Sequence, residues 1–87
     1  MNDLLSKFES VIVLRTLMED IDLNFIGVDD LEEIDLYAEE LGIGLEYVDL
    51  DDYYNSDYDG IIDVYNKWFE NINGLYLDIK NDLLKLI

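Results

Sequence analysis

The sequence predicts a mostly α-helical fold, a small bundle of three to four helices that forms a single domain over residues 1–87. Three observations support this prediction. Apolar residues recur every three or four positions in three stretches, proline is absent, and Leu, Ile, Val and Phe make up 33 of 87 residues, enough for a core despite a formal charge of −17. An α+β fold with one short two-stranded element is the alternative.

The first predicted helix covers about residues 3–20, where eight apolar side chains follow helical spacing, although SVIVL taken alone also fits a strand. Residues 20–28 alternate briefly and then meet Gly27. They predict a connector that contains at most a short strand.

The second predicted helix begins near Asp30 and ends at Gly42. Asp30, followed three residues later by Glu33, imitates a capping box, and glycine is the usual residue just past a helix end. One face of this helix is apolar, with Leu31, Ile34, Ala38 and Leu41. The other face is acidic.

Residues 43–58 fit either a helix or a strand, because Leu45–Leu50 alternates while Tyr47, Leu50 and Tyr54 keep helical spacing. From Gly60 the apolar stripe is the most regular in the chain: Ile61, Tyr65, Trp68, Ile72, Leu75, Ile79, Leu83 and Leu86. Asn73-Gly74 interrupts it, so we expect two consecutive helices or a single bent one, with a hairpin turn as the alternative. Residues 75–87 belong either to the core or to a dimer seam.

Charge is distributed very unevenly along the chain. Residues 1–15 and residues 67–87 each sum to zero, whereas residues 16–66 contain 17 acids and neither Lys nor Arg. Like charges that crowd together repel one another and lower stability, so surfaces of soluble domains normally mix signs. The separation therefore indicates a functional surface.

Missing residue types restrict the chemistry. The chain lacks cysteine and histidine, which excludes thiolate metal sites and the commonest general base. Paired carboxylates such as Asp51 and Asp52 have no nucleophile or phosphate cradle beside them, so we expect no enzymatic activity. The first 15 residues hold no apolar run long enough for a signal peptide or membrane span, which favours a cytoplasmic location.

One twelve-residue window resembles EF-hand and dockerin calcium loops. Its ligand positions 1, 3, 5, 7, 9 and 12 would be Asn55, Asp57, Asp59, Ile61 (carbonyl), Asp63 and Asn66, with glycine at position 6. Position 12 normally supplies a bidentate carboxylate, and here it is a neutral amide. We therefore predict no cofactor, with calcium as the alternative, and interpret these acids as a turn that caps the last helix.

Tyrosines are interleaved with the acids. Tyrosine is frequent at protein interfaces because it offers a large, rigid contact area and a hydroxyl. Acids repel nucleic acid and anionic membranes, so the expected partner is a basic nucleic-acid-binding protein, bound by a monomer or homodimer. The predicted partner-binding residues are Glu32, Glu33, Asp35, Glu39, Glu40, Glu46, Asp49, Asp51, Asp52, Tyr53, Tyr54, Asp57, Tyr58, Asp59 and Asp63.

With its blocks DDLEEIDLYAEE and EYVDLDDYYNSDYD, the chain resembles the small acidic DNA-mimicking inhibitors that phages and mobile elements use against restriction enzymes and CRISPR nucleases. This resemblance covers about residues 19–65. It implies an inhibitor that blocks the basic nucleic-acid site of such an enzyme, in the host cytoplasm if the chain is phage-encoded.

A more local resemblance is to the colicin DNase immunity proteins, which are acidic four-helix inhibitors of nuclease toxins. Tyr53-Tyr54, then Gly60, Tyr65, Trp68 and Asn73-Gly74 follow in a similar order. The family's proline after the tyrosine pair is Asn55 here. By this resemblance the tyrosine pair would lie at the partner surface and Trp68 in the core.

Overall fold

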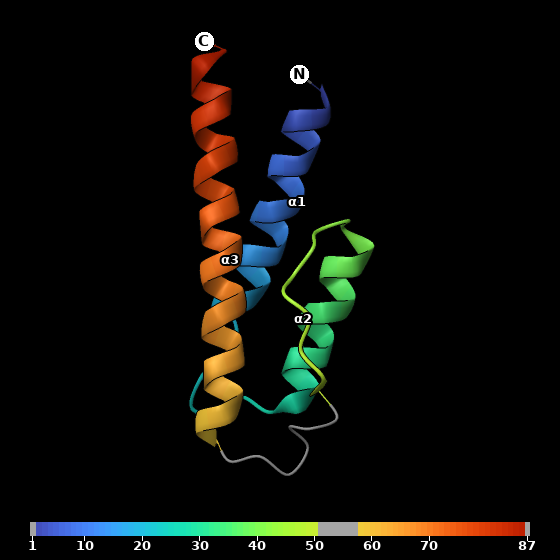
Figure 1. Cartoon of the computed structure of the whole chain (residues 1–87), viewed down its shortest axis with the longest axis vertical. Helices are drawn as coiled ribbons and strands as arrows, with labels where there is room; N and C mark the ends of the chain where they lie inside the picture. Colours follow the sequence, from blue (N-terminus) through green and yellow to red (C-terminus); the bar gives the residue numbers. More distant parts are fainter. Residues whose placement is uncertain (1, 51–57, 87) are drawn as a thin grey trace.

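The computed structural model describes residues 2–50 and 58–86, and these residues form three α-helices (Figure 1). They are α1 (Asn2–Glu19), α2 (Val28–Glu40) and α3 (Tyr58–Lys85). α2 and α3 both run antiparallel to α1. The mostly helical prediction is confirmed for the described residues, which contain no strand of the predicted α+β alternative.

The core lies where α3 packs against α1, with α2 covering one side. Its largest fully buried side chain is Trp68, which is 1% exposed, as the resemblance to immunity proteins implied. The other fully buried large side chains come from all three helices: Val11, Leu14, Met18, Leu31, Ile34 and Ile72. Each such aliphatic side chain contributes about 1.5–3 kcal/mol when it leaves water.

α1 matches the predicted first helix at both ends to within one residue, and SVIVL is helical. Apolar side chains surround this helix rather than forming a single stripe. Val11 and Leu14 are buried against the core, whereas Ile12 and Val13 between them are exposed. Because α1 is apolar on more than one side, the other two helices bury only part of its apolar surface.

α2 begins two residues before the predicted start at Asp30. Its N-cap is Gly27, and the Asp30 carboxylate accepts a 3.0 Å hydrogen bond from the Gly27 backbone N–H. The predicted box of Asp30 with Glu33 is therefore wrong. Asp30 sits at the third helical position, where an acid reaches back to the N-cap, and glycine has no side chain to return the bond.

Gly42 ends α2 as predicted, and its φ of +73° explains the choice of glycine. The Ile43 N–H donates to the Ala38 carbonyl at 2.8 Å, and the Gly42 N–H donates to the Glu39 carbonyl at 3.2 Å. These two bonds are the Schellman pattern, in which a left-handed residue satisfies the last helical carbonyls. Ile43 is buried as a result of this reversal.

Between α2 and the end of the first described range, residues 43–49 form neither helix nor strand. This segment is attached to α3 by side chains. The Trp68 indole N–H donates to the Glu46 carbonyl at 2.9 Å, and the Asn71 amide donates to the Gly44 carbonyl at 3.3 Å. The backbone carbonyls of this segment accept hydrogen bonds from side chains of α3, not from a neighbouring strand. The spacing of apolar residues therefore did not predict this irregular conformation.

α3 is a single helix of 28 residues that passes through Asn73-Gly74 without a break. Of the two preferred predictions, a single helix through this pair is confirmed and two consecutive helices are wrong, as is the hairpin alternative. A glycine inside a helix costs about 1 kcal/mol relative to alanine. Burial of Ile72 before this pair and Ile79 after it exceeds that cost, since both side chains are less than 5% exposed.

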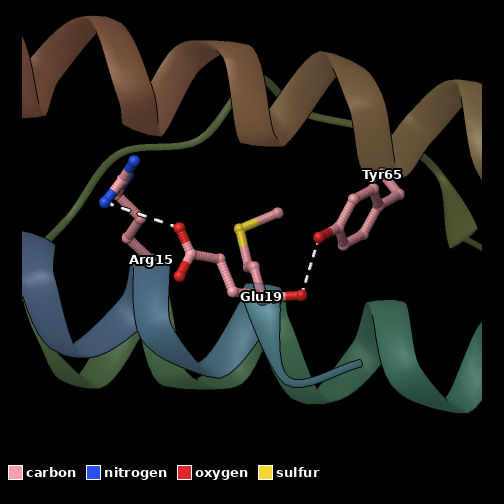
Figure 2. Close-up of polar contacts among 4 residues, drawn as sticks. Arg15, Glu19 and Tyr65 are labelled. Atoms are coloured by element: carbon pink, nitrogen blue, oxygen red, sulfur yellow. Dashed lines mark hydrogen bonds and ion pairs between the residues drawn. The ribbon is translucent and has the colours of Figure 1, made fainter. Parts of the chain in front are cut away.

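A buried hydroxyl attaches α3 to the end of α1. The Tyr65 hydroxyl donates to the Met18 carbonyl at 2.6 Å (Figure 2). Burial raises the pKa of Tyr65 above its ordinary value of 10.0, and the negative charge of Glu19 raises this pKa further. On the same turn of α1, Arg15 and Glu19 form a partly exposed ion pair at 3.4 Å, a kind that contributes about 0–1 kcal/mol.

Two glycine substitutions should have opposite effects on stability. Gly74 is helical and has open space where a Cβ would be, so Gly74→Ala should raise the free energy of unfolding by about 0.5–1 kcal/mol. Gly42→Ala places a Cβ on left-handed backbone and should lower it by about 1–2 kcal/mol. Urea denaturation of both variants measures this, and a stabilising Gly42→Ala would contradict the assigned helix end.

Replacing the buried phenol should change the pH dependence of stability. Tyr65→Phe removes one buried hydrogen bond and should lower the free energy of unfolding by about 1 kcal/mol at neutral pH. The folded chain holds the phenol proton more tightly than the unfolded chain, so the wild type loses this stability as the pH rises above 10.0.

The difference between wild type and Tyr65→Phe should therefore be largest below pH 10.0 and shrink above it. Urea denaturation of both proteins across this range provides the measurement. If the difference in free energy of unfolding stayed constant with pH, the Tyr65 hydroxyl would not donate a buried hydrogen bond to the Met18 carbonyl.

Candidate protein-binding site

The outer face of α2 gathers five of the predicted residues on one surface. All five are exposed: Glu32, Glu33, Asp35, Glu39 and Glu40. Four of them lie on the side of the helix away from its buried residues, and Asp35 lies at the edge of that side, next to buried Leu31. Side chains three or four residues apart on a helix have Cβ atoms about 5–6 Å apart. Helix geometry alone therefore makes an acidic cluster here, and Asp29 in the first turn extends it.

An exposed leucine lies at the centre of this acidic face. Leu36 is 56% exposed, and the residues three and four positions away on both sides are Glu32, Glu33, Glu39 and Glu40. The sequence analysis did not select Leu36. Its signal was nevertheless present, because Leu36 falls outside the apolar stripe of the second helix.

We refer to Asp29, Leu36 and the five predicted acids as the α2 face. Isolated exposed leucines are common on protein surfaces, and this one alone would need no explanation. An apolar side chain within a ring of like charges differs from that case, because a partner that covers it must also bring compensating positive charge. The α2 face therefore has the composition of a site for a basic protein surface.

The remaining predicted residues come from other elements. Exposed Glu46 and Asp49 lie in the segment after α2, and exposed Asp59 and Asp63 are one turn apart on α3. Glu46 has a cation near it, since its carboxylate is 3.9 Å from the Lys67 ammonium. These acids lie on other elements, so helix geometry does not place them on the same surface as the acids of α2. Five predicted residues lie outside the described ranges: Asp51, Asp52, Tyr53, Tyr54 and Asp57.

Tyr58 has a structural contact that the sequence did not indicate. It is the first residue of α3, and its hydroxyl donates to the Leu23 carbonyl in the turn between α1 and α2. This bond connects the start of α3 with that turn. The side chain remains partly exposed. A partner can therefore contact the exposed part of Tyr58, while its hydroxyl is already bonded within the chain.

The turn between α1 and α2 presents a hollow that the sequence analysis also missed. Its volume is about 340 Å³, and it is lined by Leu17, Asp20, Ile21, Asp22, Phe25 and Asp30. The Phe25 side chain is 84% exposed. Two of the carboxylates shape the turn: Asp22 accepts from the Asn24 N–H at 2.9 Å, and Asp30 caps α2. An aromatic ring beside carboxylates adds apolar contact area near the α2 face.

The calcium alternative requires a loop, and the described part of its window, residues 58–66, is helical. Asp59, Ile61, Asp63 and Asn66 all lie within α3, whereas Asn55 and Asp57 lie outside the described ranges. Within a helix the Ile61 carbonyl accepts a bond from the chain four residues later and is turned away from a metal position. The described residues hold no group of three acids placed to bind a metal ion.

Added salts should separate screening from specific calcium binding. Raising NaCl from about 0.01 M to about 0.15 M shortens the Debye length from about 30 Å to about 8 Å. A chain of formal charge −17 should therefore melt at a higher temperature in the higher salt. Calorimetric scans in CaCl₂ and MgCl₂ at equal ionic strength should give equal midpoints, and a higher midpoint in calcium alone would restore the calcium alternative.

Within the two described ranges, none of the helices is both long and apolar enough to cross a bilayer. Comparisons with protein-family models, with curated proteins and with solved structures find no match to this chain.

Proposed function

We propose that this protein is an acidic inhibitor that binds the basic nucleic-acid site of a nuclease or another DNA-binding enzyme, in the manner of a DNA mimic. Restriction enzymes and CRISPR effectors are the expected targets, in the cytoplasm. The observation that carries the proposal is the α2 face. It presents carboxylates at regular spacing around an apolar centre, in a stretch of 51 residues without Lys or Arg.

The charge density of the α2 face supports mimicry of a phosphate backbone. Its six carboxylates lie between Asp29 and Glu40, eleven residues apart, which corresponds to about 16.5 Å of helix axis at 1.5 Å per residue. The α2 face therefore carries on average one charge per about 2.8 Å of helix axis. A DNA strand carries one charge per about 3.4 Å and the duplex one per about 1.7 Å. A groove built for phosphates would meet a similar density here.

Electrostatics also determine which partners are compatible. A surface of this sign repels nucleic acid and anionic lipid, and it attracts lysine- and arginine-rich grooves. Long-range attraction speeds association, and salt weakens it within a Debye length of about 8 Å at physiological ionic strength. Leu36 and the ring of Phe25 would add contacts that salt does not screen.

An immunity protein that neutralises a nuclease toxin is the closest alternative, because it also inhibits through an acidic surface. The buried position of Trp68 agrees with that resemblance. The tyrosine pair that would contact the toxin lies outside the described residues. A panel of target enzymes that includes DNase toxins distinguishes the two.

The test is inhibition of DNA cleavage by purified restriction enzymes, CRISPR nucleases and DNase toxins, with the protein added at about 50 mM salt. We expect at least one enzyme to be inhibited, with relief by added salt and by excess duplex DNA. Glu33→Gln, Glu39→Gln and Glu40→Gln together should weaken inhibition about tenfold or more, equivalent to about 1.4 kcal/mol.

The matched control removes three charges from exposed positions elsewhere, with Glu70→Gln, Asp78→Asn and Asp82→Asn on α3. It changes the net charge by the same amount and should weaken inhibition much less. Equal losses in both triple variants would show that net charge acts without the α2 face. A panel in which no enzyme is inhibited would reject the proposal.

A further inference from the structure

The N-terminal part of α1 and the C-terminal part of α3 extend past the end of α2 as a pair of antiparallel helices (Figure 1). Aromatic packing holds the pair together. The rings of Phe8 and Tyr76 stack with centroids 5.3 Å apart, and the Arg15 guanidinium lies 4.7 Å from the Tyr76 centroid. These contacts mark the seam between the two helices.

Large aliphatic side chains are exposed on this pair, and four of them form two stripes. Leu5 and Ile12 on α1 are 46% and 39% exposed, and Leu77 and Leu84 on α3 are 47% and 57% exposed. The members of each helix are seven residues apart, a spacing that keeps side chains on one stripe. Each helix therefore carries its own exposed apolar stripe.

Helix geometry places the two stripes on the same side of the pair. Each residue advances about 100° around a helix axis. Ile12 and Leu5 follow the seam residue Phe8 by about 40° and 60° in the sense of that rotation, and Leu77 and Leu84 follow Tyr76 by about 100° and 80°. Because the helices are antiparallel, the same sense of rotation leads to the same side.

The segment after α2 lies on the other side of the pair. Trp68, whose indole donates to the Glu46 carbonyl, precedes Tyr76 by eight residues and is rotated about 80° in the opposite sense. We call the side with Leu5, Ile12, Leu77 and Leu84 the arm face. All four side chains are exposed, so the described helices of this chain do not cover them.

Charge distinguishes the arm face from the rest of the molecule. The sequence segments that supply it, residues 1–15 and 67–87, each have a net charge of zero, and all of the −17 arises between them. Exposed Glu9 lies beside the stripe on α1, and exposed Lys80 lies beside the stripe on α3. Exposed Glu70, seven residues before Leu77, lies on the same stripe of α3. The face is therefore apolar at its centre and carries two acids and one base.

We propose that the arm face binds a second copy of this chain in a two-fold symmetric dimer. Under two-fold symmetry one patch meets its own copy, so the patch must be self-complementary. Acids and a base around an apolar centre satisfy this requirement, because the base of each copy can meet an acid of the other. A strongly basic partner has no reason to choose this face, because the acids that would attract it lie elsewhere in the chain.

The available area suits a weak dimer. From the half-buried Phe69 to Leu84 this side of α3 measures about 22.5 Å, and two adjacent helices are about 20 Å wide, giving about 450 Å². Stable interfaces bury about 800 Å² per partner, and accessible area exceeds such a flat footprint. The molecule is 48 Å long, so an end-to-end arrangement separates the acidic parts by more than the Debye length of about 8 Å.

Sedimentation equilibrium of the full-length protein tests this proposal. We expect twice the monomer mass of 10.2 kDa at a concentration of about 0.1 mM, as for a weak interface. Dimerisation should become tighter with added NaCl, because salt screens the repulsion between copies without weakening apolar contact. Inhibition through the α2 face should respond in the opposite direction, so the two proposals can fail separately.

The variant pair Leu77→Ser and Leu84→Ser should weaken dimerisation about tenfold or more while the helical circular dichroism stays unchanged. Leu23→Ser with Leu36→Ser is the matched control, since both leucines are exposed outside the arm face. This control should remain dimeric. A wild-type protein that stays monomeric at low and high salt, or a control that dissociates as readily as the test pair, would overturn the proposal.

Discussion

The packing of α3 against α1 is the interaction on which the other features depend. Trp68 and Ile72 from one helix, with Val11 and Leu14 from the other, fill the centre of this seam without a buried charge. This packing stabilises α3 as a continuous helix through Gly74. It also forms the apolar surface against which α2 packs. Nearly all of the side chains that determine the fold are thus apolar, which leaves the acids available for other roles.

This separation explains how so acidic a chain can fold. Burial of aliphatic and aromatic groups supplies the stability, while the carboxylates lie outside and repel one another across water rather than across protein. The two charge-balanced ends of the sequence pair with each other in α1 and α3. The anionic stretch contributes α2 and the connections around it, so the surface proposed for partner binding lies beside the main seam.

Local signals in the sequence predicted α1, the end of α2 at Gly42 and the acids of the α2 face, because each depends on neighbours within one or two helical turns. Other features depend on distant parts of the chain. Asn73-Gly74 has the composition of a turn and is helical only because Ile72 and Ile79 are buried on either side. Residues 43–49 are held by α3 side chains, a contact that periodicity does not encode. Leu36 interrupts the acidic face of α2 at a position outside the apolar stripe, a signal that the sequence pattern does contain.

The hydrogen bond between the Trp68 indole and the Glu46 carbonyl has a practical consequence. The chain contains one tryptophan, so its tryptophan fluorescence originates at a single point where α3 meets the segment after α2. Detachment of that segment would admit water to the indole and move its emission to longer wavelength even while the helices persist. The molecule therefore carries its own optical reporter for the attachment of this segment to α3.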